Sequence, residues 1–395
     1  MNILILNSGS SSIKFQLIEM PSEKLVCSGL LERIGHQDAV INYKTEKVNL
    51  KKVQPIESFK LGLQKMVDLL LDPEQGVIKN TAEIEVIGHR VVHGGNSFSN
   101  TILITSKVKA EIKKSFPLAP LHNPANLEGI IVAEKLFPSA KQVAVFDTAF
   151  HQTIPDKAKR YAISNTFFEA GIQVYGFHGI SHKYVSQKAI EYLDLKKSKI
   201  ITVHLGNGCS MTAVKDGQSI DHSLGFTPSN GLIMGTRSGD IDHGAIFYMV
   251  NTLGYTVEEV NNLLTKKSGM LGLTGYSDLR DIIAEAENGN KDCQLALAMN
   301  TYRIKKYIGS YTAAMNGLDA IIFTAGIGEN ANLIRKMVCE DMEYLGVGFD
   351  EVKNKVKSNE LREISTDDSK VKVLVIPTNE EIEIAKQSYG LLKKT

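Results

Sequence analysis

The chain has 395 residues, 43% hydrophobic and 23% charged, a composition typical of a globular protein with two domains. Its 45 lysines and arginines nearly balance its 44 aspartates and glutamates, which argues against a surface dedicated to nucleic acid. No apolar run reaches the roughly 18–20 residues of a membrane helix, and no basic stretch precedes the first apolar run, so we expect neither a membrane segment nor a signal peptide.

Short apolar runs that are typical of buried strands recur along the whole chain. They are Ile3–Leu6, Val86–Val92, Val143–Phe146, Ile200–Val203, Ile321–Thr324 and Val371–Ile376. Helical patterns lie between many of these runs, and strands that alternate with helices indicate an α/β architecture with mixed sheets. No low-complexity linker interrupts the pattern, and we place the domain boundary near residue 150.

Three helices are predicted from the spacing of their apolar residues. In the first, Phe59, Leu63, Met66, Val67 and Leu70 share one face. The second begins at Asn123-Pro124, with the asparagine expected as the N-cap and the proline in the first turn. The last covers residues 379–394, where the acids of Glu380-Glu381 would be favoured by the helix dipole alone.

A strand–turn–strand pattern occurs once in each half of the chain. Asn7 opens the turn in the first half, and His204 opens the turn in the second. Two similar hairpins about half a chain apart suggest a duplicated domain. Two unrelated hairpins explain the repeated strand–turn–strand pattern equally well, so the pattern by itself leaves both interpretations open.

Three loops of small residues follow strands: Asn7–Lys14, His204–Ser210 and Gly326–Asn330. Such loops allow backbone N–H groups to converge on a phosphate, although each is also compatible with a simple tight turn. A Walker A loop is absent from the sequence. The run from Gly326 to Ala331 also fits the loose dinucleotide fingerprint of a nicotinamide-dependent dehydrogenase, but too few residues follow it for a six-stranded nucleotide fold.

Three charged residues stand in positions suited to ligand binding. Arg90 lies in an apolar strand that ends in two glycines, and Arg237 lies in a loop rich in glycine and aspartate. A guanidinium in such surroundings needs an anion, which is either a ligand or a structural carboxylate. Asp147 follows a buried strand, where open α/β sheets place ligand groups, although it would also serve as a turn cap.

Histidines and cysteines give little support to a zinc site. His89 and His93, like His178 and His182, are four residues apart, but no cysteine or third histidine completes a set of ligands. His178 precedes a helical pattern and would also serve as its cap. The four cysteines include no C-x-x-C pair, which is typical of a protein in the reducing cytoplasm.

Long and distinctive segments of this chain resemble the acetokinase family, the acetate kinases. In chain order the segments are Asn2–Lys14, Gly88–Gly95, Pro120–Asn126, Phe146–His151, Tyr175–Gly179, His204–Gly208, Gly235–Asp242, Thr324–Asn330 and Thr378–Glu381. They span the whole sequence, so chance does not explain them.

The resemblance implies an α/β fold of two duplicated actin-like (ribonuclease H-like) domains around a nucleotide cleft. We expect the N-terminal domain over residues 1–150, joined by a C-terminal helix over 381–395, and the second domain, with the nucleotide-binding loops, over 151–380. The implied reaction is reversible phosphoryl transfer from ATP to acetate, giving ADP and acetyl phosphate. It implies Mg²⁺, with Mn²⁺ as an alternative, in a cytoplasmic homodimer that binds neither nucleic acid nor membrane.

The resemblance also implies roles for individual residues. Asp147, His178 and Arg237 would be catalytic; Arg90, Val92 and His122 would bind the acid substrate; and Asn7 and Glu380 would serve the metal. ATP would be bound by Lys14, His204, Leu205, Gly206, Asn207, Gly208, Asp278, Leu279, Arg280, Gly326, Ile327, Gly328, Glu329 and Asn330.

The chemistry accounts for these residue types, because phosphoryl transfer needs mainly positioning and neutralisation of charge. A carboxylate substrate is already ionised at neutral pH, so we expect Asp147 to organise the site rather than abstract a proton. Val92 would favour acetate, although one methylene is worth only about 1–3 kcal/mol and propionate or another short acid stays an alternative substrate. An actin-like ATP-binding protein without acid-kinase activity is a further alternative.

Four positions depart from the family pattern: Asn96, Ile180, His222 and His243. None of them carries one of the roles above. They therefore bear on local loop geometry and not on the class of reaction.

Overall fold

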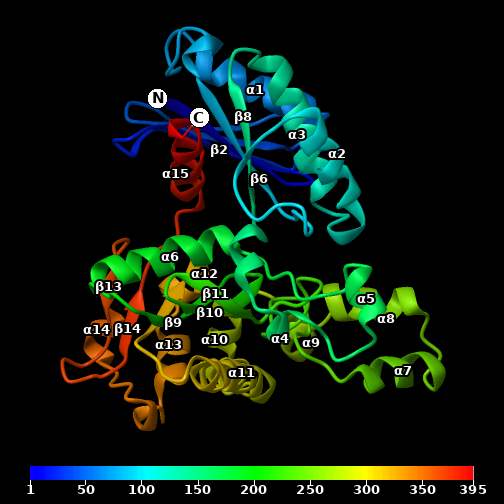
Figure 1. Ribbon diagram of the computed structural model, residues 1–395, viewed down its shortest axis with the longest axis vertical. Helices are drawn as coiled ribbons and strands as arrows, with labels where there is room; N and C mark the ends of the chain where they lie inside the picture. Colours follow the sequence, from blue (N-terminus) through cyan, green and yellow to red (C-terminus); the bar gives the residue numbers. More distant parts are fainter. Residues whose placement is uncertain (395) are drawn as a thin grey trace. The chain divides into compact units, whose positions relative to one another are not determined.

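The computed structural model describes residues 1–394, which form two compact units. Unit 1 combines Met1–Phe150 with the segment that begins at Asn379, and unit 2 comprises His151–Thr378. Each unit is built on a central β-sheet with helices packed against it (Figure 1). Within residues 1–394, no helix combines the length and the apolar character that crossing a bilayer requires.

Unit 1 contains an eight-stranded mixed sheet in the order β5-β4-β3-β2-β1-β6-β8-β7. Its strands are β1 (Asn2–Ser8), β2 (Ile13–Glu19), β3 (Lys24–Glu32), β4 (Val40–Thr45), β5 (Asn49–Val53), β6 (Val86–Val91), β7 (Ile102–Leu103) and β8 (Lys141–Phe146). Its main helices are α1 (Phe59–Leu71), α2 (Ser106–Lys114), α3 (Asn123–Leu136) and α15 (Glu380–Lys393). Strands β1, β6 and β8 are parallel neighbours, whereas β1 to β5 form an antiparallel meander.

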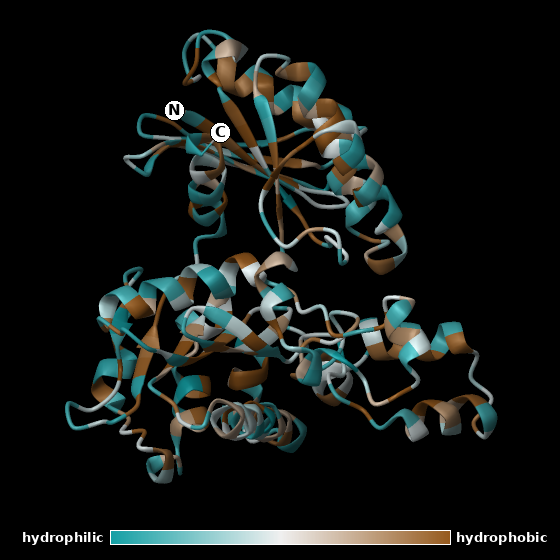
Figure 2. Ribbon diagram, viewed as in Figure 1, coloured by the Kyte–Doolittle hydropathy of each residue, from teal (hydrophilic) through white to brown (hydrophobic). Residues whose placement is uncertain are grey.

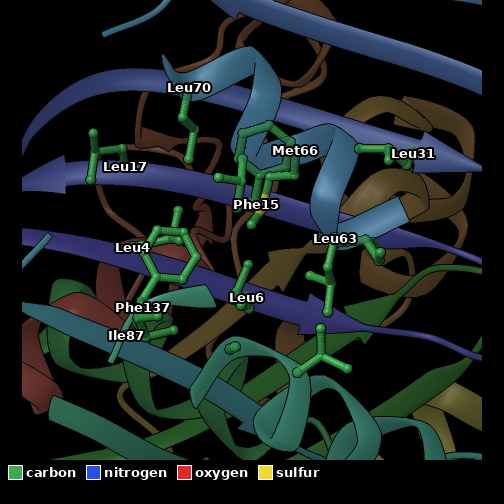
Figure 3. Close-up of a cluster of buried hydrophobic side chains, with 14 of the residues drawn as sticks. Leu4, Leu6, Phe15, Leu17, Leu31, Leu63, Met66, Leu70, Ile87 and Phe137 are labelled. Carbon is green, nitrogen blue, oxygen red and sulfur yellow. The ribbon is translucent and has the colours of Figure 1, made fainter. Parts of the chain in front are cut away.

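The core of unit 1 forms where α1 packs on the sheet. Ser58 caps this helix through its side chain, which accepts a hydrogen bond from the backbone N–H of Leu61. The apolar face predicted from the sequence is buried, and it contacts alternate residues of the strands. Figure 3 shows this cluster, in which Leu63, Met66 and Leu70 of the helix face Leu4 and other strand residues.

The predicted N-cap of α3 is wrong. The helix begins at Asn123 and its N-cap is His122, which makes no capping hydrogen bond through its side chain. The Asn123 amide is instead used at longer range: its Oδ1 accepts from the backbone N–H of His93, and its Nδ2 donates to the backbone carbonyl of the same residue. Pro124 does lie in the first turn, as expected.

Helix α15 covers the sheet of unit 1 on the face opposite α1 and α3 (Figure 1). Asn379 caps it by accepting a hydrogen bond from the backbone N–H of Ile382. The approach to β6 is close, because a Cβ atom at Gly88 would lie 2.8 Å from Cγ2 of Ile384 and 3.0 Å from Oγ of Ser388. The two ends of the chain thus meet in one unit.

Unit 2 contains a six-stranded sheet in the order β11-β10-β9-β12-β14-β13. Its strands are β9 (Lys199–Leu205), β10 (Cys209–Lys215), β11 (Gln218–His222), β12 (Ala320–Thr324), β13 (Arg362–Glu363) and β14 (Lys372–Val375). Its helices are α4 (Asp156–Lys159), α5 (Asn165–Glu169), α6 (Gly179–Tyr192), α7 (His243–Asn251), α8 (Val257–Lys266), α9 (Gly269–Thr274), α10 (Leu279–Glu287), α11 (Lys291–Met315), α12 (Ala325–Asn330), α13 (Asn332–Cys339) and α14 (Glu351–Lys355). Helices α6 and α11 lie on opposite faces of the sheet (Figure 1).

The two sheets repeat one topology. In unit 1, β3-β2-β1-β6-β8 are successive neighbours, and in unit 2, β11-β10-β9-β12-β14 are successive neighbours in the corresponding order. Each hairpin recognised in the sequence, β1–β2 and β9–β10, is antiparallel, and its first strand pairs in parallel with the next strand of the sheet. The common order agrees with a duplicated domain. Figure 2 shows hydrophobic residues concentrated on the central strands of both units.

The close packing of Phe15 on Gly29 predicts the effect of one substitution. The two residues are partners across β2 and β3, and a Cβ at position 29 would lie 2.2 Å from two ring atoms of Phe15. Because this ring is fully buried, Gly29→Ala should lower the free energy of unfolding by about 1–3 kcal/mol. Calorimetric melting measures the loss.

Gly309→Ala is the matched control for Gly29→Ala. This glycine lies in α11, and a Cβ there would meet no atom within 4 Å. Its replacement by alanine should leave the free energy of unfolding unchanged or raise it by up to about 1 kcal/mol, because alanine has the higher helix propensity. The melting temperature should therefore not fall. Equal melting temperatures for Gly29→Ala and the wild type would contradict the packing described for this strand pair.

Candidate active site

Three predicted site residues of unit 1 lie at the ends of neighbouring parallel strands. Asn7 is near the end of β1, Arg90 is near the end of β6, and Asp147 directly follows β8. Since the carboxyl ends of parallel strands meet at one edge of a sheet, the topology brings these residues together.

The guanidinium of Arg90 is the centre of this cluster. Its Nη1 donates to Oδ1 of Asn7 at 3.2 Å, and its Nε donates to Oδ1 of Asp147 at 3.1 Å. Its Nη2 donates to Oδ2 of Asp147, so the pair is bidentate. Burial lowers the pKa of Arg90, but Asp147 and Glu380 raise it by more, and the side chain stays charged. Of the two interpretations that the sequence left open for Arg90, the structure contains the ion pair.

Helix α15 adds two carboxylates to the same region. Oε2 of Glu380 lies 3.7 Å from Nε of Arg90, and Oε1 of Glu381 lies 2.7 Å from Nζ of Lys14. Burial raises the pKa of Glu380 to about 7; Arg90 opposes the rise, whereas Asp147 and Glu381 add to it. The acids of this helix turn therefore do more than match the helix dipole.

The charges in this cluster fit a divalent cation. Three carboxylates, of Asp147, Glu380 and Glu381, face two cationic side chains, and burial together with the neighbouring carboxylates raises the pKa of Glu380. Amide and carboxylate oxygens are ligands that Mg²⁺ prefers, and Mg²⁺ usually takes only one or two carboxylates together with water and phosphate oxygens. Among residues 1–394, no group of three or more His, Cys, Asp and Glu side chains is arranged as a metal site.

The other two predicted substrate residues of unit 1 differ in exposure. Val92 is buried, and its backbone N–H donates to Oδ1 of Asn126. His122, in contrast, is exposed at the N-cap of α3. The substrate roles of both residues stay predictions.

Unit 2 contains a pocket of about 710 Å³. Nine of the residues predicted to bind ATP line it: Leu205, Gly206, Asn207, Asp278, Leu279, Arg280, Gly326, Ile327 and Asn330. The sequence analysis missed ten others, among them the apolar side chains of Ile233, Met234, Met270 and Ile283. Their signal was weak, because they come from loops and helices that carry no phosphate-binding pattern. An apolar pocket beside glycine-rich loops suits a nucleotide base.

Five predicted nucleotide residues do not line this pocket: Lys14, which belongs to unit 1, and His204, Gly208, Gly328 and Glu329. Oε1 of Glu329 accepts a hydrogen bond from the backbone N–H of Thr378, and the carbonyl of Gly328 accepts from Nη1 of the buried Arg335. These two residues therefore support the loop between β12 and α13 rather than face the pocket.

The turn between β9 and β10 brings two predicted catalytic residues together. A Cβ atom at Gly208 would lie 3.6 Å from Nε2 and Cε1 of His178 and 3.7 Å from Nη1 of Arg237. The same turn is held by a hydrogen bond from the N–H of Gly235 to the carbonyl of Asn207, at 3.2 Å. Glycine is needed at 235, because a Cβ there would lie 2.2 Å from Oδ1 of Asn207.

Arg237 is partly buried and has no anionic partner among the residues that the structure describes. Its Nη1 donates to the carbonyl of Pro228 at 2.8 Å and lies 3.6 Å from Sδ of Met234. Burial lowers the pKa of this guanidinium, and the only group that raises it is the thiol of Cys209. A partly desolvated cation that meets only neutral groups is suited to bind an anion.

His178 belongs to a cluster of five histidines in unit 2. Its ring stacks on that of His204, with centroids 4.4 Å apart and planes 13° apart. His182 lies within 6 Å of both His204 and His222, and His151 packs against His222. His178 is the N-cap of α6 but makes no capping hydrogen bond through its side chain, so the cap interpretation is wrong for the imidazole.

The fold defines an actin-like protein with duplicated α/β domains, in which one unit holds a cluster of charged side chains at the strand ends and the other holds a pocket beside glycine-rich loops. A profile of the acetokinase family matches residues 2–386, and the chain belongs to that family. It is similar to the acetate kinase of Flavobacterium johnsoniae, with 64% identity over all of both chains.

Two solved structures are also similar over nearly their whole length. The acetate kinase of Porphyromonas gingivalis is 44% identical, with 99% of each chain covered and a TM-score of 0.94. A propionate kinase of Francisella tularensis is 42% identical, with 98% of this chain and 99% of that one covered and a TM-score of 0.92. Membership of the acetokinase family overturns the dehydrogenase interpretation of Gly326–Ala331, which lies in the short α12 and at its C-cap.

The solitary charge of Arg237 leads to a prediction about the free protein. Arg237→Met removes a desolvated cation, so it should raise the free energy of unfolding by roughly 1 kcal/mol. Inorganic pyrophosphate should raise the melting temperature of the wild type but not that of the variant, because a ligand stabilises only the protein that binds it. Thermal melting with and without pyrophosphate measures both effects.

Arg303→Met is the control for Arg237→Met. Nη1 of Arg303 lies 3.6 Å from Oδ2 of Asp240 and donates to the carbonyl of Gly231, so its removal should destabilise the protein and preserve the response to pyrophosphate. A wild-type response to pyrophosphate in Arg237→Met would contradict the anion site.

Proposed function

We propose that the protein is an acetate kinase, which transfers the γ-phosphoryl group of ATP reversibly to acetate and gives ADP and acetyl phosphate. Support comes from the family match over residues 2–386 and from the 64% identical relative named acetate kinase. The structural observation that carries the proposal is Arg237, a cation without an anionic partner among the described residues, placed beside His178 and the nucleotide-binding turn.

In unit 1, we assign the acetate carboxylate to Arg90. Its planar guanidinium suits a carboxylate, and the acid that now pairs with it, Asp147, fixes its orientation. Acetate is ionised at neutral pH, so the reaction needs no general base. The bidentate contact with Arg90 supports an organising role for Asp147 over proton abstraction.

In unit 2, we assign the nucleotide to the pocket beside the turn at residues 206–208. Arg237 and His178 would donate hydrogen bonds to oxygens of the phosphoryl group in transfer, where negative charge is spread over the equatorial oxygens. Fixed donors in a partly dry site stabilise that charge without reorganising, which is the main demand of this chemistry.

We also assign magnesium to Asn7 and Glu380, with Lys14 serving the phosphates. When bound, the metal would neutralise charge on the β- and γ-phosphate oxygens. The excess of carboxylates described above supports this assignment. The four buried free cysteines support a reducing compartment, and we place the protein in the cytoplasm.

Trapping acetyl phosphate as its hydroxamate tests the reaction directly. With ATP and Mg²⁺, acetate should give product, propionate should give less, and butyrate should give almost none. Arg90→Ala should raise the KM for acetate by about 100-fold, since it removes a charged, bidentate contact worth up to about 3 kcal/mol.

The same assay separates the alternatives. A propionate kinase would prefer propionate over acetate, and an actin-like ATP-binding protein without acid-kinase activity would give no hydroxamate with any acid. Lys109→Ala is the control, because this lysine pairs with Glu134 at the surface of unit 1, away from the strand ends. An unchanged KM in Arg90→Ala would contradict the assignment of acetate to this residue.

We further propose a homodimer, formed through the surface of α7 and the segment after it. None of the nine residues of α7 is buried, and its large side chains Phe247 and Tyr248 are about 60% exposed. Leu253, Tyr255 and Val257, which follow the helix, are 45–74% exposed. Large apolar side chains that gather on one surface indicate a protein interface.

Phe247→Asp combined with Tyr248→Asp should convert the dimer to a monomer, because two desolvated carboxylates oppose association. Light scattering after size-exclusion chromatography measures the mass. Tyr344→Asp, at an exposed position on another segment of unit 2, should leave the dimer intact. A monomeric wild type would contradict the proposal.

A further inference from the structure

We propose that a buried hydrogen-bonded chain, Thr202–His182–Ser210, fixes His178 in the tautomer with its proton on Nε2, so that this histidine donates a hydrogen bond beside Arg237. The inference rests on the proposed function only in giving that hydrogen bond a phosphoryl oxygen as its acceptor. His182 and Ser210 are then positioning residues, which act through His178.

The strand register places the members of the chain on one face of the sheet. In the antiparallel pair β9–β10, Thr202 lies opposite Thr212, and His204 lies opposite Ser210. Side chains two residues apart share a face, and α6 packs against β9 with His182 one turn after His178. His182 thus reaches both strands, with Thr202 at one ring nitrogen and Ser210 at the other.

The distances describe a continuous chain of hydrogen bonds. Oγ1 of Thr202 lies 2.6 Å from Nδ1 of His182, and Nε2 of His182 lies 2.7 Å from Oγ of Ser210. Oγ of Ser210 lies 2.9 Å from Nδ1 of His178. Thr202, His182 and Ser210 are all fully buried, so water does not offer them other partners.

Counting protons assigns a direction to this chain. Burial lowers the pKa of His182 well below its usual range, and the imidazoles of His222 and His151 lower it further, so the ring is neutral and carries one N–H. If that proton were on Nδ1, it would be donated to Thr202, whose own hydroxyl proton would then lack an acceptor among residues 1–394. An orphaned buried donor costs about 1–3 kcal/mol.

The opposite direction satisfies every donor. Thr202 donates to Nδ1 of His182, Nε2–H of His182 donates to Ser210, and the hydroxyl of Ser210 donates to Nδ1 of His178. Nδ1 of His178 is then an acceptor, so the single proton of the neutral ring is on Nε2.

The geometry directs this proton to the nucleotide-binding turn. Nε2 of His178 lies on the side of the ring that faces Gly208, next to Nη1 of Arg237. Stacking on His204 holds the ring plane, and Nδ1 of His204 is itself bonded to Oγ of Ser181. The donors of His178 and Arg237 thus both border the position of Gly208, and His178 can donate from its neutral ring.

The ¹⁵N spectrum of the imidazole rings, recorded without substrate in mildly alkaline buffer, tests the assignment. We expect His178 to show a protonated Nε2 and an unprotonated Nδ1, with its signals identified by their absence in His178→Gln. A protonated Nδ1 in the wild type would overturn the proposal. Because no substrate is used, this result stands whether or not the protein proves to be an acetate kinase.

A pair of variants tests the chain itself. Ser210→Ala removes the hydroxyl that donates to His178, so the spectrum should show a mixture of tautomers, and kcat should fall about tenfold with little change in either KM, as expected for one neutral hydrogen bond. Thr202→Val removes a buried hydroxyl of the same chain. With valine at 202, a proton on Nδ1 of His182 would itself lack the acceptor that Thr202 provides, so the proton stays on Nε2 and the direction of the remaining bonds is unchanged.

Thr202→Val should therefore lower the melting temperature and preserve both the tautomer and kcat. If Ser210→Ala kept the wild-type tautomer and kcat, or if Thr202→Val lost kcat as Ser210→Ala does, the chain would have only a structural role and the proposal would fail. If Ser210→Ala does not fold, the wild-type spectrum still tests the tautomer of His178, and the kcat of Thr202→Val still tests the role of the chain.

Discussion

The cost of holding positive charge away from water governs both halves of this molecule. Arg90 meets that cost with a bidentate carboxylate, an amide oxygen and a second carboxylate nearby, so its surroundings carry excess negative charge. Arg237 meets only carbonyl and thioether groups, so its surroundings carry excess positive charge. The cluster around Arg90 in unit 1 is therefore suited to a cation, and the surroundings of Arg237 in unit 2 are suited to an anion.

The strands of the fold and the site residues at their ends could be predicted from the sequence, because strands and their ends are local features. Apolar runs located β1, β6 and β8, and the residues that end them, Asn7 and Asp147, were recognisable without knowledge of the fold. The glycine-rich loops were visible for the same reason, since a loop that approaches a phosphate closely needs residues without side chains. The family resemblance then related these pieces to one reaction.

What could not be predicted depends on packing between distant segments. The partner of Arg90 is 57 residues away, and the partner of Lys14 lies on the last helix. The apolar wall around Met234 and Met270 carries no motif, because any well-packed side chain of similar size would serve. The sequence pattern predicted Asn123 as a helix cap, but its side-chain amide instead makes hydrogen bonds with the buried backbone N–H and carbonyl of His93. No local pattern predicts a contact over 30 residues.

Helix α15 gives unit 1 a dependence on the end of the chain. The helix covers the face of the sheet where Gly88 lies, and Glu380 and Glu381 belong to its first turn. During synthesis, the first 150 residues leave the ribosome long before this helix exists, so that face has no cover while all of unit 2 is being made. The acidic cluster is therefore assembled only after unit 2 has been made, and a chain that stops before Asn379 leaves this face of the sheet uncovered and lacks Glu380, one of the two residues assigned to the metal.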